Sequence, residues 1–262
     1  MLQKWDPNRI IEKIPFNIAL TGGRRMGKST AVADLVHRMR NQFDLMICFV
    51  GSAACNPQLS GLMTKHWDDR FFFPAWNTDL MNKLFEQQEE LKKKGIERKI
   101  CVLVDDVVLT SNAEDQLAHL AMRGRHFNIS LFMCAVSYTT LPKRVRRSLD
   151  VLLVYSCPMQ GDRKVLTWEF SNHTKMAEYV LKNLKEYECL VMETLSKQQQ
   201  LFLWKADVIG NNQKRARSDP SESGSPASPE RSDQRSEPLN QTGNASPADR
   251  TQSSANSEPS LA

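Results

Sequence analysis

An eight-residue stretch, Gly22 to Ser29, combines the residue types that bind phosphate groups. It reads Gly-Gly-Arg-Arg-Met-Gly-Lys-Ser, which fits the pattern of glycine, four free positions, glycine, lysine and serine or threonine. The glycines let the loop curl so that backbone N–H groups point at phosphate oxygens. Lys28 adds a positive charge for the β- and γ-phosphates, and Ser29 offers a hydroxyl to Mg²⁺. We expect ATP and Mg²⁺ as cofactors, held by Gly22, Gly23, Arg24, Arg25, Met26, Gly27, Lys28, Ser29 and Thr30.

Two adjacent carboxylates follow a second apolar run. Residues 100–104 are all apolar, and Asp105 and Asp106 come directly after them. If this run is a central parallel strand, its acids emerge at the carboxyl edge of the sheet, where a phosphate loop also lies. Asp105 is then expected in the Mg²⁺ shell, and Asp106 is expected to orient or deprotonate an attacking water. Aspartates are also common where a strand turns, so this pair gains its meaning from the loop 77 residues before it.

The elements that must position these residues can be predicted from the hydrophobic pattern. Val32, Leu35, Val36 and Met39 are spaced as one face of a helix after the loop. The pattern predicts helices over residues 28–41, 79–94, 113–126 and 171–185. Apolar runs predict buried strands over residues 16–21, 45–50, 100–104, 129–136 and 151–155, and a closing pair over 188–193 and 201–204. Buried parallel strands that alternate with helices indicate an α/β fold of three layers around a mainly parallel central sheet.

Residues 52–79 are expected to be irregular, and they contain an aromatic cluster. We interpret this cluster as local core under a long loop, the alternative being a base-stacking or DNA-facing surface. Its members are Trp67, Phe71, Phe72, Phe73 and Trp76.

Composition divides the chain into a domain over residues 1–210, which contains both motifs and is the expected P-loop ATPase domain, and a tail over 211–262. The tail has no aromatic residue and is rich in Ser, Pro, Asn and Gln, so we expect it to be disordered. The cluster Lys214-Arg215-Ala216-Arg217 is interpreted as solubilising, with nuclear import or DNA contact as the alternative. No apolar run approaches the ~20 residues that span a bilayer. The net charge of +5 permits a polyanionic partner without requiring one.

Four segments together resemble a known family. They are residues 22–29, 103–106, 123–130 and 141–150, the last two being rich in arginine. Together they resemble the DNA-packaging ATPases of double-stranded DNA viruses, the poxvirus-type packaging motors of the FtsK/HerA superfamily. The resemblance covers roughly residues 14–207 and implies a RecA-like P-loop NTPase fold.

The resemblance implies an ATP-hydrolysing motor that moves viral double-stranded DNA into a preformed capsid. Its partners would be DNA and capsid or portal components, and its subunits would form a homo-oligomeric ring. In such rings an arginine of a neighbouring subunit stabilises charge on the γ-phosphate. The resemblance implies Arg146 and Arg147 as catalytic residues in this role, alongside Lys28 and Asp106, with Arg123 and Arg125 as the alternative pair. It places the protein in the host nucleus or a cytoplasmic viral factory, or in the virion.

One position departs from the family. The family usually has a glutamine at the end of the fourth strand, where this chain has Val136, which cannot form a side-chain hydrogen bond. Ser137 or Thr139 would have to replace it, or hydrolysis would be slow. Two other functions therefore stay open. One is a nucleotide-binding assembly subunit with weak or no turnover, and the other is a P-loop small-molecule kinase with the basic run 143–147 as its lid.

Overall fold

The computed structural model describes residues 2–51, 57–170, 173–195 and 199–208. The predicted disordered tail, 211–262, and the basic cluster at 214–217 lie outside these residues. Within them the chain forms an α/β fold around an eight-stranded sheet of order β3-β2-β4-β5-β1-β6-β7-β8. The strands are β1 (Asn17–Thr21), β2 (Leu45–Val50), β3 (Phe72–Phe73), β4 (Ile100–Asp105), β5 (Ile129–Ala135), β6 (Val151–Val154), β7 (Glu188–Glu193) and β8 (Gln200–Lys205).

The sheet is mainly parallel, as the sequence predicts. Strands β3, β2, β4, β5, β1 and β6 pair in parallel, and only β7 and β8 run antiparallel to their neighbours. Strand β5 separates β1 from β4, and the register places Cys134 opposite both Leu20 on one side and Asp105 on the other. The carboxyl ends of β1 and β4 are therefore level with each other, with the end of β5 between them.

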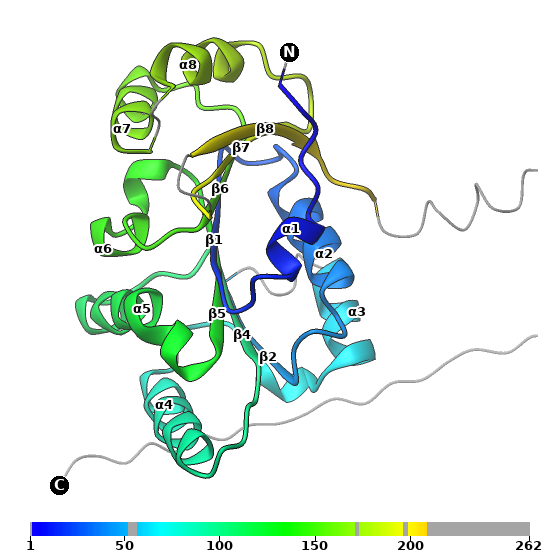
Figure 1. Cartoon of the computed structure of the whole chain (residues 1–262), viewed down its shortest axis with the longest axis vertical. Coiled ribbons are helices and arrows are strands. Elements are labelled where there is room, and N and C mark those ends of the chain that lie inside the picture. The colour runs from blue at the N-terminus through cyan, green and yellow to red at the C-terminus, as the bar shows by residue number, and fades with distance from the viewer. Residues whose placement is uncertain (1, 52–56, 171–172, 196–198, 209–262) are drawn as a thin grey trace, which may run out of the picture. The chain divides into compact units, whose positions relative to one another are not determined.

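Helices cover both faces of the sheet and complete the three layers (Figure 1). Side chains of β1 alternate between the two cores: Ile18 and Leu20 lie in one, and Ala19 lies in the other. The first core includes residues of α1 (Asn8–Ile11), α2 (Lys28–Arg38) and α3 (Pro57–His66). The second includes residues of α4 (Thr78–Lys93), α5 (Ser111–Arg123), α6 (Lys143–Arg146), α7 (Gln160–Phe170) and α8 (Thr174–Lys182).

Several local predictions are wrong. The stretch expected to be irregular contains α3, the 3₁₀ turn η2 (Asp69–Phe71) and β3. Helix α7 was not predicted, because its polar residues give it only a weak apolar face. The predicted helix over 113–126 ends as α5 at Arg123 and continues as the 3₁₀ turn η3 (Gly124–Phe127). Its N-cap is Thr110, whose hydroxyl accepts from the N–H of Ala113.

The aromatic cluster is local core, as interpreted from the sequence. Trp67 and Phe72 pack against the first core, and Phe71, Phe73 and Trp76 pack against the second. The ring of Trp76 lies 4.7 Å from that of Phe49, a buried residue of β2. These aromatic rings therefore cover the β2 side of the sheet, and the base-stacking alternative is not needed to account for them.

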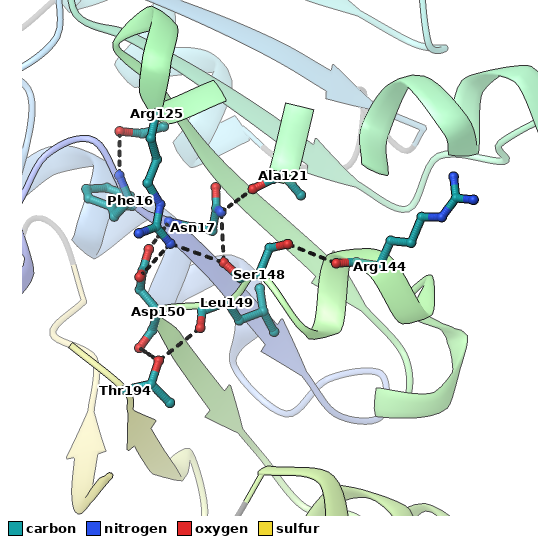
Figure 2. A network of polar contacts seen from close by, with 10 residues as sticks. Phe16, Asn17, Ala121, Arg125, Arg144, Ser148, Leu149, Asp150 and Thr194 are labelled. Carbon is teal, nitrogen blue, oxygen red and sulfur yellow. Dashed lines mark hydrogen bonds and ion pairs between the residues drawn. The ribbon is translucent and has the colours of Figure 1, made fainter. Parts of the chain in front are cut away.

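A polar network at the amino edge of the sheet fixes β1 against β6 (Figure 2). Buried Asp150, just before β6, accepts from the backbone N–H of Asn17 at 2.7 Å and from Arg125 at 2.7 Å. The Asn17 amide donates to the carbonyls of Ala121 at 2.7 Å and Ser148 at 2.8 Å. The network thus joins the start of β1, the end of α5 and the segment before β6.

Candidate functional site

The Gly22–Thr30 loop connects β1 to α2, in the order that the sequence predicts. A Cβ at Gly22 would lie 2.6 Å from the Cβ of Tyr155, and Gly22 has a φ of +149°. Gly27 has a φ of +97° and immediately precedes α2. Both positions therefore require glycine, one for close packing and both for their backbone conformation. The backbone N–H groups of the first turn of α2 have no partner within a helix, which suits an anion.

The ammonium group of Lys28 lies within its own loop. It donates to the carbonyl oxygens of Gly22 at 2.6 Å and Gly23 at 2.8 Å. Burial lowers the pKa of Lys28, while the nearby charges of Asp105 and Asp106 act in the opposite direction. The lysine is thus held by weak neutral acceptors in a partly desolvated place, where phosphate oxygens would be stronger partners.

Asp105 is the last residue of β4 and is partly buried. Burial raises the pKa of its carboxyl group, and the positive charge of Lys28 opposes this effect. Asp106 is exposed and adopts a φ of +53°, a left-handed conformation that aspartate tolerates better than most residues. The two consecutive acids therefore differ in environment. Asp105 is partly buried, whereas Asp106 is exposed to solvent and has the left-handed backbone conformation.

The structure brings Lys28, Asp105 and Asp106 together at the carboxyl edge. They come from opposite sides of β5 and interact through their charges. Ser29 lies beside Lys28 in the first turn of α2. The described residues contain no group of three or more His, Cys, Asp or Glu side chains that could hold a metal alone. A serine hydroxyl and one carboxylate do fit Mg²⁺, which is commonly bound by one or two carboxylates with phosphates and waters.

A hollow of about 230 Å³ lies directly beside the loop. Its walls come from one residue outside the loop, Tyr187, and from Arg25, Gly27, Lys28, Ser29 and Thr30. Tyr187 was not singled out from the sequence. It lies in the turn before β7, and no local sequence signal indicates that this turn is close in space to the phosphate loop, 160 residues earlier in the chain. Two larger hollows, of about 380 and 520 Å³, are lined by residues of other regions and contain no part of the phosphate loop.

The predicted catalytic arginines lie in different environments. Arg146 is 11% exposed, its Nε lies 3.4 Å from a carboxylate oxygen of Glu169, and its guanidinium stacks 5.0 Å from the ring of Tyr138. Arg125 is paired with Asp150 at the opposite edge of the sheet from the loop. Arg147 and Arg123 are exposed, and neither has an ion pair within the described residues.

The end of β5 lies between the loop and the acids. Val136, at the position where the resemblance implies a glutamine, is 53% exposed. The hydroxyls of Ser137 and Thr139 both donate to the carboxylate of Asp162 on α7, each at 2.5 Å. Ser137 and Thr139, the two candidate replacements for the glutamine, are therefore both hydrogen-bonded to α7. Val136, which stands at the glutamine position itself, is apolar.

These features define an α/β fold of the P-loop ATPase class, with a phosphate loop and two acids at one edge of a mainly parallel sheet. The family model described as "Poxvirus A32 protein" matches residues 3–167, more than half of the chain. The chain therefore belongs to the Poxvirus A32 family.

Solved structures share the fold at low sequence identity. The DNA-packaging ATPase B204 of Sulfolobus turreted icosahedral virus matches with a TM-score of 0.52 and 17% identity, over 72% of this chain and 97% of B204. The B204 packaging NTPase of Sulfolobus turreted icosahedral virus 2, solved with ATPγS, gives 0.50 and 17%, over 76% and 98%. The conjugation coupling protein TcpA of pCW3 gives 0.55 and 14%, over 76% and 62%. No curated protein matches the chain significantly.

Proposed function

We propose that this protein hydrolyses ATP with Mg²⁺ and uses the energy to package viral double-stranded DNA. The observation that carries the proposal is the meeting of Lys28 with Asp105 and Asp106 across β5. A loop that cradles phosphates needs no paired acids to bind them. Acids two strands away but level with the loop are suited to a metal and a water at the terminal phosphate.

Each residue has a defined task in this proposal. Lys28 leaves the carbonyls of Gly22 and Gly23 and contacts the β- and γ-phosphate oxygens. Ser29 and Asp105 would hold Mg²⁺, which neutralises charge on the phosphates when bound. Asp106 orients the attacking water and accepts its proton. An exposed arginine of a neighbouring subunit stabilises the charge that develops on the γ-phosphate.

The packaging role is supported by membership of the Poxvirus A32 family and by the fold shared with the B204 packaging ATPase. The protein would act as a homo-oligomeric ring on double-stranded DNA, with capsid or portal components as partners. It would work in the host nucleus, in a cytoplasmic viral factory or in the virion. In the described part of the chain, no helix is long and apolar enough to cross a bilayer.

The test is phosphate release from ATP with and without double-stranded DNA. We expect release that requires Mg²⁺ and rises with DNA, that is abolished by Lys28→Ala, and that is abolished by Asp106→Asn without loss of ATP binding. Asp115→Asn, an exposed carboxylate on α5, is the matched control and should leave turnover unchanged. No hydrolysis by the wild type with DNA and capsids present would contradict the proposal.

A specific observation favours the assembly subunit without turnover as second candidate. Val136 cannot orient a water, and Ser137 and Thr139 are bonded to Asp162. Tight ATP binding with no phosphate release would support this candidate. The kinase is less well supported, because Arg144 pairs with Asp115 and Arg146 with Glu169, so α6 lies against α5 and α7 and does not form a lid over the loop.

A further inference from the structure

The strand order determines the direction in which a nucleotide would lie along the sheet edge. The acids follow β4, which is two strands from β1 on one side. On the other side of β1 come β6 and then β7. Since β7 runs antiparallel to β6, it begins at the carboxyl edge, and Tyr187 immediately precedes it. A nucleotide with its terminal phosphate toward Asp105 and Asp106 therefore extends its nucleoside toward Tyr187.

Tyr187 is an exposed aromatic residue with a left-handed backbone conformation. The residue is 47% exposed, and its φ of +61° is unfavourable for an aromatic residue. Its ring is nonetheless close to the loop, since a Cβ at Gly27 would lie 3.3 Å from its Cδ1. The ammonium of Lys205 lies 5.7 Å from the ring centroid. Backbone strain at an exposed aromatic beside a ligand site is the kind of feature that points to function.

Tyr187 also lines two adjoining hollows. The first is the loop hollow that includes Lys28 and Thr30, and the second, of about 250 Å³, includes Met26, Tyr155 and Glu188. Because its ring lines both hollows, Tyr187 lies where the nucleoside would be expected to follow the phosphates of a bound nucleotide. An exposed aromatic face suits a nucleobase, because every base has a π-face and stacking needs no hydrogen-bond partner.

We propose that the ring of Tyr187 stacks on the base of the nucleotide whose phosphates the Gly22–Thr30 loop holds. This inference rests on the proposed nucleotide binding and deepens it by naming the residue that recognises the nucleoside. Because every base has a π-face, the ligand class is a nucleoside triphosphate as distinct from its phosphate chain alone. Tyr187 is a nucleoside-binding residue and takes no part in the hydrolysis itself.

The experiment compares a nucleotide with its phosphate part alone. ATP and inorganic tripolyphosphate are titrated by calorimetry into the wild type, Tyr187→Ala and Tyr187→Phe, each shown by thermal unfolding to be folded. Alanine and phenylalanine both have a Cβ, so the positive φ at this position is unfavourable for both variants, and the comparison between them isolates the aromatic ring. Tyr187→Ala should weaken ATP binding about 5- to 150-fold. Tyr187→Phe should stay within about twofold of the wild type, and tripolyphosphate should bind all three proteins alike.

Each other outcome has one meaning. If Tyr187→Ala weakens ATP and tripolyphosphate equally, the ring positions the loop and the inference is wrong. If it weakens neither, or if Tyr187→Phe is as weak as Tyr187→Ala, no stacking occurs and the inference is wrong as well. If the wild type binds neither ATP nor tripolyphosphate, and so behaves like the negative control Lys28→Ala, the proposed nucleotide binding itself is wrong. The two failures are therefore distinguishable.

Discussion

The backbone oxygen of Asp106 lies only 2.0 Å from the point where a Cβ at Gly51 would stand. Gly51 follows β2, and its N–H donates to the carbonyl of Asp105 at 3.0 Å. The missing side chain of Gly51 thus leaves the space in which Asp106 takes its left-handed conformation. The glycine and the acid are 55 residues apart in sequence, yet a side chain on one would collide with the backbone of the other.

Replacing Gly51 with alanine should displace Asp106 from this position. We expect a loss of about 1–3 kcal/mol in the free energy of unfolding and a fall in turnover that exceeds any loss of ATP binding. The matched control is Gly61→Ala within α3, where an added Cβ meets nothing within 4 Å. It should stabilise by about 0.5–1 kcal/mol. Urea unfolding measures the stability of both variants, and phosphate release measures their turnover. Normal turnover in Gly51→Ala would show that the position of Asp106 does not matter for hydrolysis.

The phosphate loop, both acids and most strands could be predicted because their signals are local. Lys28 and Ser29 stand in a fixed motif, and the run before Asp105 is continuously apolar because β4 is covered on both faces. The sequence alone could also place both at one edge, since carboxyl ends of parallel strands coincide.

The contributions of Gly51 and Tyr187 could not be predicted, because they depend on which strands are neighbours. Gly51 is a plain glycine after a strand, and it gains its meaning only from the pairing of β2 with β4. Tyr187 reaches the loop only because β7 reverses direction beside β6. Helix α3 escaped prediction for a different reason, since its apolar residues contact the first core at only three buried positions, Leu59, Leu62 and Met63.

Three of the four candidate arginines should separate into two groups. Arg146→Ala should lower the free energy of unfolding by about 1–3 kcal/mol, because it removes the cation from the Tyr138 ring and leaves Glu169 with the Tyr138 hydroxyl but without its ion pair. Arg147→Ala and Arg123→Ala should change stability by no more than about 0.5 kcal/mol. The one that acts on a neighbouring subunit should lower kcat about 10³-fold.

Mixing separates an effect in the ring from an effect within one subunit. A protein with the active arginine replaced, combined with one that carries Lys28→Ala, should regain turnover, because sites with an intact loop then receive an intact arginine. No regain for either Arg147 or Arg123 would assign the role to another cation.

The stability of the Asp150 network should depend on pH with a definite sign. Burial, only partly opposed by the Asn17 N–H and Arg125, raises the folded pKa of Asp150 above the ordinary value of 3.8. The stability that its protonated form contributes is complete below the unfolded pKa and is lost as the pH rises through the folded pKa. The unfolding free energy of the wild type minus that of Asp150→Asn should therefore fall over this window, by at most about 1.4 kcal/mol per pH unit.

Arg125→Ala supplies the control for this window. Without the guanidinium the folded pKa of Asp150 should rise further, so the decline measured in the Arg125→Ala background should extend to higher pH. Urea unfolding between about pH 4 and pH 7 measures both series. A difference that rises with pH would mean that the Arg125 pair outweighs burial.

The exposed Val136 offers a direct test of why turnover would be slow. Val136→Gln should be accommodated without strain, since the position is 53% exposed, and stability should change by no more than about 0.5 kcal/mol. If the end of β5 faces the attacking water, the added amide supplies one hydrogen bond in the transition state. We expect kcat to rise about tenfold, which is one hydrogen bond of ~1.4 kcal/mol, with ATP affinity unchanged.

Val136→Ala, which supplies no such bond, is the control. Equal turnover in both variants would mean that the water is oriented by Asp106 alone, and that the hydroxyls bonded to Asp162 serve to hold α7 in place.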